Sequence, residues 1–121
     1  MTSFAIETPV SVGWIGAGRL ARALAMRAHG AGVRTVAVAN RSSAPAAWLA
    51  HATGAKAADP QGVADAADWV FVTVPDDAIP GVVNHVRWRP GQLVLHCSGA
   101  GERDLLDALS LIHISEPTRP Y

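Results

Sequence analysis

The sequence has a single cysteine and no excess of charge of either sign, and each absence excludes a class of protein. Cys97 cannot form a disulfide within the chain. Ten Lys and Arg residues balance ten Asp and Glu residues, so no overall field attracts nucleic acid or an anionic membrane surface. We therefore expect no nucleic-acid partner, and a ligand must be recognised by local groups.

Long apolar runs are also absent. No uninterrupted run approaches the roughly 20 apolar residues that a membrane-spanning helix needs. Residues 1–9 lack the basic start and the apolar core of a secretory signal peptide. We therefore expect a cytoplasmic protein that does not contact the membrane. Hydrophobic residues still make up 50% of the 121 residues, which is enough apolar material for the core of about one domain.

What the sequence does contain is an alternation of strand and helix patterns between residues 11 and 108. The patterns predict strands at 11–15, 34–39, 56–58, 69–74 and 92–97, and helices at 19–30, from 42 or 43 to 53, from 60 onward, at 78–86 and from 102 to 108. This alternation predicts right-handed crossovers and a doubly wound parallel sheet of about five strands, of the α/β class. Ligands of such sheets bind beyond the carboxyl ends of the strands.

The first predicted strand runs directly into the segment Gly16-Ala17-Gly18-Arg19-Leu20-Ala21, which fits the pattern G-x-G-x-x-A. Gly16 allows a tight turn, Gly18 lets the backbone approach a pyrophosphate, and Ala21 lets the helix pack closely on the strand. The helix would point its first N–H groups at the phosphates. The segment therefore predicts a dinucleotide site, and the alternative is a plain strand-to-helix turn. Arg19 either contacts the ligand or is an ordinary surface arginine.

The segment after the second predicted strand, Asn40-Arg41-Ser42-Ser43, discriminates between cofactors. A carboxylate at this point binds the ribose 2′-OH of NAD, whereas a 2′-phosphate requires that carboxylate to be absent and a guanidinium to be near. Asn40 stands where the carboxylate would be, and Arg41 can bind a phosphate. The segment predicts NADP as cofactor over NAD. The alternative is a solvated arginine beside a serine that caps the next helix.

No catalytic residue can be assigned from the sequence. Asp76 and Asp77 follow the fourth strand, and we interpret them as helix caps. His96 and Ser98 share one face of the fifth strand while Cys97 faces the other, and the sequence identifies no third residue that would orient a nucleophile. Cys97 is expected to be a small buried hydrophobic residue, and Ser98 to shape a turn beside the cofactor.

Two further expectations concern metals and tryptophans. The five histidines show neither the H-x-x-x-H nor the H-E-x-x-H spacing, so no metal site is predicted. Trp14, Trp48 and Trp69 fall on predicted strand or helix positions, and we expect them in the core.

Four segments together resemble a known family: residues 12–21, 40–42, 70–79 and 95–100. They are similar to an NADP-dependent oxidoreductase family with an N-terminal Rossmann-like domain and a C-terminal helical domain. The cofactor half is also similar to pyrroline-5-carboxylate reductase and to deazaflavin-dependent NADP reductases. The resemblance covers nearly all of the chain up to Ala108, and its most specific part is His96-Cys97-Ser98-Gly99-Ala100, which resembles the family's His-x-Ser-Gly-Ala.

The resemblance implies a role for each of three loops. The pyrophosphate would lie on Gly16, Ala17, Gly18, Arg19 and Leu20. The ribose at the adenosine end would lie near Asn40, Arg41 and Ser42, and the ribose at the nicotinamide end near Val74 and Pro75.

Residues 109–121 resemble the translation of a sequencing adapter of the transposase type, read in frame, and we expect them to form no domain. The alternative is a natural tail made irregular by Pro117 and Pro120. On the first interpretation the Rossmann-like domain occupies residues 1–108. The second domain of the family, in which substrate recognition and homodimerisation are expected, would then be absent.

We therefore expect the NADP-binding domain of an oxidoreductase that transfers hydride between nicotinamide and a small carbonyl or imine substrate. By itself this chain is expected to bind NADP(H) weakly and to catalyse nothing. One alternative is a non-enzymatic redox or nucleotide sensor that binds NADP(H). Another is a methyltransferase or other adenosine-binding fold.

Overall fold

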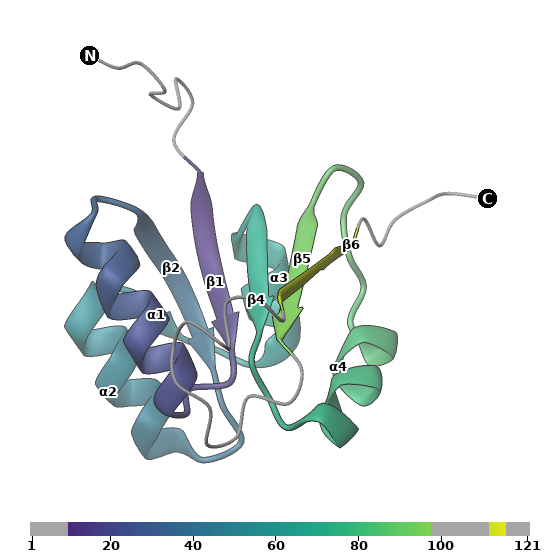
Figure 1. Ribbon diagram of the computed structural model, residues 1–121, viewed down its shortest axis with the longest axis horizontal. Coiled ribbons are helices and arrows are strands. Elements are labelled where there is room, and N and C mark those ends of the chain that lie inside the picture. The colour runs from purple at the N-terminus through teal and green to yellow at the C-terminus, as the bar shows by residue number, and fades with distance from the viewer. Residues whose placement is uncertain (1–9, 98–111, 116–121) are drawn as a thin grey trace.

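Strands and helices alternate along the chain, as the sequence pattern predicts (Figure 1). The computed structural model describes residues 10–97 and 112–115. The strands are β1 (Ser11–Ile15), β2 (Arg34–Ala39), β3 (Lys56–Ala57), β4 (Trp69–Val72), β5 (Leu93–Cys97) and β6 (Ile112–Ser115). The helices are α1 (Arg19–Gly30), α2 (Ser43–Thr53), α3 (Pro60–Ala66), the short 3-10 helix η1 (Asp76–Ala78) and α4 (Ile79–His85). The predicted helix at 102–108 lies outside the described residues.

The strands form one sheet in the order β3-β2-β1-β4-β5-β6. The first five strands in this order form four parallel pairs, and β6 pairs antiparallel with β5. The chain moves outward from β1 to β3 and then returns to place β4 on the other side of β1. The order of the strands therefore reverses between β1 and β4, and the predicted doubly wound sheet of the α/β class is confirmed.

Two apolar clusters fill the two faces of the sheet. On one face, α1 and α2 pack on β1 and β2 through Val12, Trp14, Ala17, Ala21, Ala25, Val38, Ala46 and Leu49. On the other face, α3 and α4 pack on the strands through Ile15, Ala37, Ala39, Val63, Ala67, Val70, Val72 and Val94, with Ile79 and Val82 at the margin. Ala21 is buried where α1 crosses the sheet, as expected of the last small residue in the G-x-G-x-x-A segment.

The residues that cap the starts of the helices agree only in part with those expected from the sequence. Asp59 caps α3, because its carboxylate accepts a 2.7 Å hydrogen bond from the Gly62 N–H. Ser42 is the N-cap residue of α2, but its side chain makes no capping hydrogen bond. The interpretation of Asp76 and Asp77 as caps of the following helix is wrong, because the chain first makes the turn η1 and α4 then starts after Ala78.

The carboxyl end of α3 is held by two side chains from the segment before β5. Gln92 is 2% exposed, and its amide donates to the Ala64 and Ala67 carbonyls at 2.6 and 2.7 Å. The side-chain oxygen of Gln92, Oε1, accepts from the backbone N–H of Arg89 at 2.7 Å. The Arg89 guanidinium also donates to the Ala67 carbonyl at 2.7 Å. The carbonyls of Ala64, in the last turn of α3, and of its C-cap residue Ala67 are satisfied in this way.

Two features differ from the sequence-based expectation. Trp48 is not in the core: it is 52% exposed, because α2 turns Ala46, Leu49, Ala50 and Thr53 toward the sheet, and the Arg22 guanidinium lies 5.9 Å from its ring centroid. Residues 112–115 form a strand, whereas the sequence analysis left them out of the fold. Their sequence, Ile-His-Ile-Ser, alternates apolar and polar residues with the two-residue period of a strand, and they pair with the edge of β5.

Candidate dinucleotide site

Three loops meet at the carboxyl edge of the sheet because the strands before them end in register. Ile15 pairs with Ala39 on one side and with Val72 on the other. The residues that follow, Gly16, Asn40 and Thr73, therefore begin three loops at the same level. In Figure 1 this is the edge to which the arrowheads of β1, β4 and β5 point. The predicted site segments after β1, β2 and β4 are thus brought together.

The turn after β1 needs glycine at position 16 for two reasons. Gly16 has φ +109°, a backbone conformation that side chains with a Cβ rarely adopt. A Cβ at this position would also lie 2.7 Å from the Thr73 carbonyl oxygen. The Gly16 N–H donates to the Ala39 carbonyl at 2.7 Å, which ties the turn to the end of β2. The structure thus agrees with the tight-turn role that the sequence predicts for Gly16.

Gly18 is placed differently, at the start of α1 with open space beside it. Among the described residues, no heavy atom beyond its chain neighbours lies within 4 Å of the position that a Cβ on Gly18 would take. Gly18 is the N-cap residue of α1 and has no capping side chain, and the first turn of the helix has no acidic residue. Arg19 is exposed and Leu20 half-buried. Space and a positive helix end, without a carboxylate nearby, suit a phosphate group.

The side chain of Asn40 turns toward the glycine turn. Its Oδ1 accepts a 2.9 Å hydrogen bond from the Ala17 N–H, and its Nδ2 donates to the Ser42 carbonyl at 3.0 Å. Arg41 and Ser42 are both exposed next to it. Ala17 itself is buried: its methyl group packs in the core, while its N–H makes the hydrogen bond to Asn40. The segment after β2 carries no carboxylate, as the sequence shows.

Thr73 is a site residue that the sequence analysis missed. It ends the pairing of β4, because its N–H donates to the Ile15 carbonyl at 2.8 Å and its hydroxyl donates to the Gly16 carbonyl at 3.2 Å. The strand was predicted to continue to residue 74, but it stops at Val72. The signal available in the sequence was a hydroxyl-bearing residue in an otherwise apolar strand.

The remaining predicted site residues flank this edge. Val74 is half-buried against the second apolar cluster, and Pro75 is exposed, with its carbonyl accepting from the Ala78 N–H at 2.8 Å. Ser98 lies outside the described residues. Of the residues weighed as catalytic, Asp77 is exposed in η1, and His96 is half-buried on β5. No side-chain geometry is described for Asp76 and Cys97.

Neither a metal-binding cluster nor a membrane-spanning helix is found in the part of the chain that the structure describes. Within residues 10–97 and 112–115, no three His, Cys, Asp or Glu side chains come together in a group that could bind a metal ion. Over the same ranges, none of the helices has both the length and the apolar character that crossing a membrane requires.

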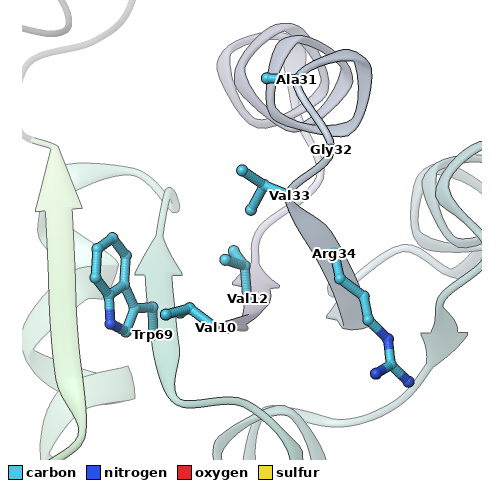
Figure 2. A pocket seen from close by; sticks show the side chains of 7 residues that line it. All are labelled: Val10, Val12, Ala31, Gly32, Val33, Arg34 and Trp69. Atoms are coloured by element: carbon cyan, nitrogen blue, oxygen red, sulfur yellow. The ribbon is translucent and has the colours of Figure 1, made fainter. Parts of the chain in front are cut away.

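A separate hollow lies at the opposite edge of the sheet. Figure 2 shows its wall, with the side chains of Val10, Val12, Val33 and Trp69 around it and the Arg34 side chain extending away. Its volume is about 340 Å³. Because Arg34 and Trp69 are the first residues of β2 and β4, the hollow lies at the amino ends of the strands. It therefore contributes nothing to the loops that follow the carboxyl ends.

The parallel sheet, the reversal of strand order beside β1 and the glycine turn at that point define a Rossmann-like dinucleotide-binding domain. The family model described as "NADP oxidoreductase coenzyme F420-dependent" matches residues 11–99. The chain belongs to this family. A comparison with curated proteins finds no match.

Solved structures of oxidoreductases have the same fold. A Bacteroides fragilis protein described as an NADP oxidoreductase is 28% identical over 78% of this chain, with a TM-score of 0.62. An imine reductase from Myxococcus stipitatus, solved in complex with NADP+, is 28% identical over 74% of the chain, with a TM-score of 0.61. A pyrroline-5-carboxylate reductase from Coxiella burnetii, at 23% identity over 64% of the chain and a TM-score of 0.59, shares the fold. The chain spans 37%, 32% and 30% of the lengths of these three proteins.

Proposed function

We propose that this chain is the NADP-binding part of an oxidoreductase that transfers hydride between nicotinamide and a small carbonyl or imine substrate. The observation that carries the proposal is the glycine turn of β1, which meets the loops of β2 and β4 at one edge in a chain of the NADP oxidoreductase family. The imine reductase from Myxococcus stipitatus, with NADP+ bound, supports the choice of cofactor and of substrate class.

In the proposed site the pyrophosphate lies at the start of α1. Gly18 leaves the space that the phosphates need, and the N–H groups of Arg19 and Leu20 are available in the first turn of the helix. Gly16 and Ala17 shape the turn from which that helix starts. The guanidinium of Arg19 contributes positive charge at the same helix end.

The adenosine ribose lies at the loop after β2. Arg41 and Ser42 are exposed there and can donate to a 2′-phosphate, while Asn40 supplies no negative charge that would repel it. The absence of a carboxylate from this loop is what favours NADP over NAD. The ribose on the nicotinamide side lies along Val74 and Pro75, with Ser98 beside them.

The bound nicotinamide would supply or accept the hydride, and this chain would bind and orient it. We propose that the substrate is recognised by a domain of the longer protein outside these 121 residues, because this chain spans only 37%, 32% and 30% of the lengths of the related solved structures. Homodimerisation, which the family resemblance implies, and a cytoplasmic location, which the sequence suggests, belong to that proposal. The chain by itself would bind the cofactor weakly, because a dinucleotide site is a crevice completed by neighbouring structure.

Two measurements test the proposal. Titration of the 121-residue chain with NADPH and with NADH, followed by nicotinamide fluorescence, should give binding that favours NADPH. NADPH oxidation over a panel of ketones and imines should be measurable with the longer protein and absent with this chain. Equal binding of the two cofactors would contradict the assignment of the 2′-phosphate loop. Equal turnover by the chain and the longer protein would contradict the proposed location of the substrate site.

A further inference from the structure

Asn40 joins the two loops that the proposed site needs, and both ends of its side-chain amide are used. On one side Oδ1 accepts from the Ala17 N–H at 2.9 Å, and on the other Nδ2 donates to the Ser42 carbonyl at 3.0 Å. The partners fix the orientation of the amide, since a flipped amide would place its NH2 group against an N–H and its oxygen against a carbonyl.

The link belongs to a larger connection between the two strands. The Gly16 N–H donates to the Ala39 carbonyl at 2.7 Å, so two consecutive residues of the glycine turn are bound to the two consecutive residues at the end of β2. The first of these bonds is made by the backbone and is available to any residue at position 39. The second depends on the side chain at position 40.

The chemistry of this link selects asparagine. An aspartate could still accept from the Ala17 N–H, but its second oxygen would face the Ser42 carbonyl oxygen without a proton between them. Alanine would remove both bonds. The absence of a carboxylate at position 40 is therefore required by the backbone of the two loops as well as by the charge of a 2′-phosphate.

We infer that Asn40 is a positioning residue for 2′-phosphate selectivity. It holds the loop of Arg41 and Ser42 at a fixed place relative to the pyrophosphate turn, so that a dinucleotide bound at Gly18 presents its 2′-phosphate to Arg41. Asn40 acts through these loops, because the two hydrogen bonds of its amide hold its side chain between Ala17 and Ser42. The inference rests on the proposed binding of NADP.

The test is a double-mutant cycle between Asn40 and Arg41 on the 121-residue chain, read by calorimetric binding of NADP+, NAD+ and 2′,5′-ADP. Asn40→Ala should weaken NADP+ and 2′,5′-ADP about tenfold, the effect of one lost hydrogen bond to a charged group, and leave NAD+ within about twofold. In the Arg41→Ala background the same substitution should have little further effect on NADP+, because the group that Asn40 positions is gone. Asn40→Asp should lose at least as much NADP+ affinity as Asn40→Ala.

Each outcome is distinguishable. A wild-type chain that binds neither NADP+ nor 2′,5′-ADP would overturn the proposed function together with this inference. A wild-type chain that prefers NADP+, with losses from Asn40→Ala and Arg41→Ala that simply add, would overturn the inference alone. A lower melting temperature for Asn40→Ala with an unchanged ratio of NADP+ to NAD+ affinity would reduce Asn40 to a structural residue and also overturn it.

Asn40→Ser provides a second variant if Asn40→Ala fails to fold. Its hydroxyl keeps a polar group at the end of β2 but is too short to reach both Ala17 and Ser42. It should therefore lose 2′-phosphate selectivity as Asn40→Ala does, and retained selectivity in this variant would contradict the inference. Exchange of the Ala17 amide with solvent, followed by NMR, should be faster in either variant than in the wild type.

Discussion

Gly16 and Thr73 are in contact across the boundary between β1 and β4, although 57 residues separate them in the chain. The Thr73 hydroxyl donates to the Gly16 carbonyl, and the Thr73 backbone occupies the space where a side chain at position 16 would begin. The shape of the nucleotide turn is therefore determined by β4 as much as by the glycine residues of the turn.

Gly16→Ala should destabilise the fold through two separable effects. The positive φ alone costs about 1–3 kcal/mol for a residue with a Cβ, and the contact with the Thr73 carbonyl adds to that cost. Gly32→Ala is a matched control, because Gly32 has φ +88° but open space around it. Urea denaturation should show a larger loss for Gly16→Ala than for Gly32→Ala. Equal losses would mean that β4 does not constrain the turn.

Gly18→Val should abolish dinucleotide binding while the fold is retained. The new side chain begins in open space among the described residues, but it would fill the volume proposed for the pyrophosphate. The poorer N-cap should cost no more than about 1 kcal/mol of stability. Circular dichroism would verify the fold and fluorescence titration the binding. Undiminished affinity in a folded variant would remove the pyrophosphate from this turn.

Arg41→Ala should weaken NADPH by about 1.5–3 kcal/mol and leave NADH nearly unchanged, because only NADPH offers the guanidinium a 2′-phosphate. Arg27→Ala serves as the control for a general loss of positive charge, since Arg27 is exposed in the last turn of α1, away from the loops. Parallel fluorescence titrations of both variants with both cofactors give the comparison. If both cofactors lost affinity equally, Arg41 could have no role in recognising the 2′-phosphate.

Gln92→Met should lower the free energy of unfolding by about 2–3 kcal/mol, since the side chain keeps its length but leaves buried groups with fewer hydrogen bonds. Gln61→Met is the matched control. Gln61 also makes three hydrogen bonds, to Asp65 and to both backbone groups of Arg87, but these lie in solvent-exposed surroundings. Its loss should cost only about 0.5–1 kcal/mol. A denaturant series on both variants would decide, and similar losses would show that burial of Gln92 is unimportant.

The alternation of strands and helices, and most element boundaries, could be read from the sequence because they depend on local patterns. The bounds of β1, α1 and β2 match the prediction residue for residue, since glycine turns separate them clearly. The cap of α3 by Asp59 was predictable for the same reason, because the carboxylate and its partner are three residues apart.

What could not be predicted depends on partners that are distant in the chain. Gln92 can be buried because its amide donates to the carbonyls of Ala64 and Ala67, which lie 28 and 25 residues away in the chain. No local sequence pattern predicts these partners. Trp48 was expected in the core because it is large and apolar, but small residues and Leu49 form the buried face of α2. Asn40 was predicted to stand at the ribose, and its use in linking two loops became visible only when β1 and β2 were paired.

The links of Asn40 to Ala17 and of Thr73 to Gly16 also bear on the order of folding. They close loops of 23 and 57 residues, so the glycine turn cannot reach its final shape as an isolated peptide or early in synthesis. The turn takes that shape only after β4 has paired with β1. Cofactor binding therefore depends on long-range strand pairing, and a bound dinucleotide would hold together strands that lie far apart in the chain.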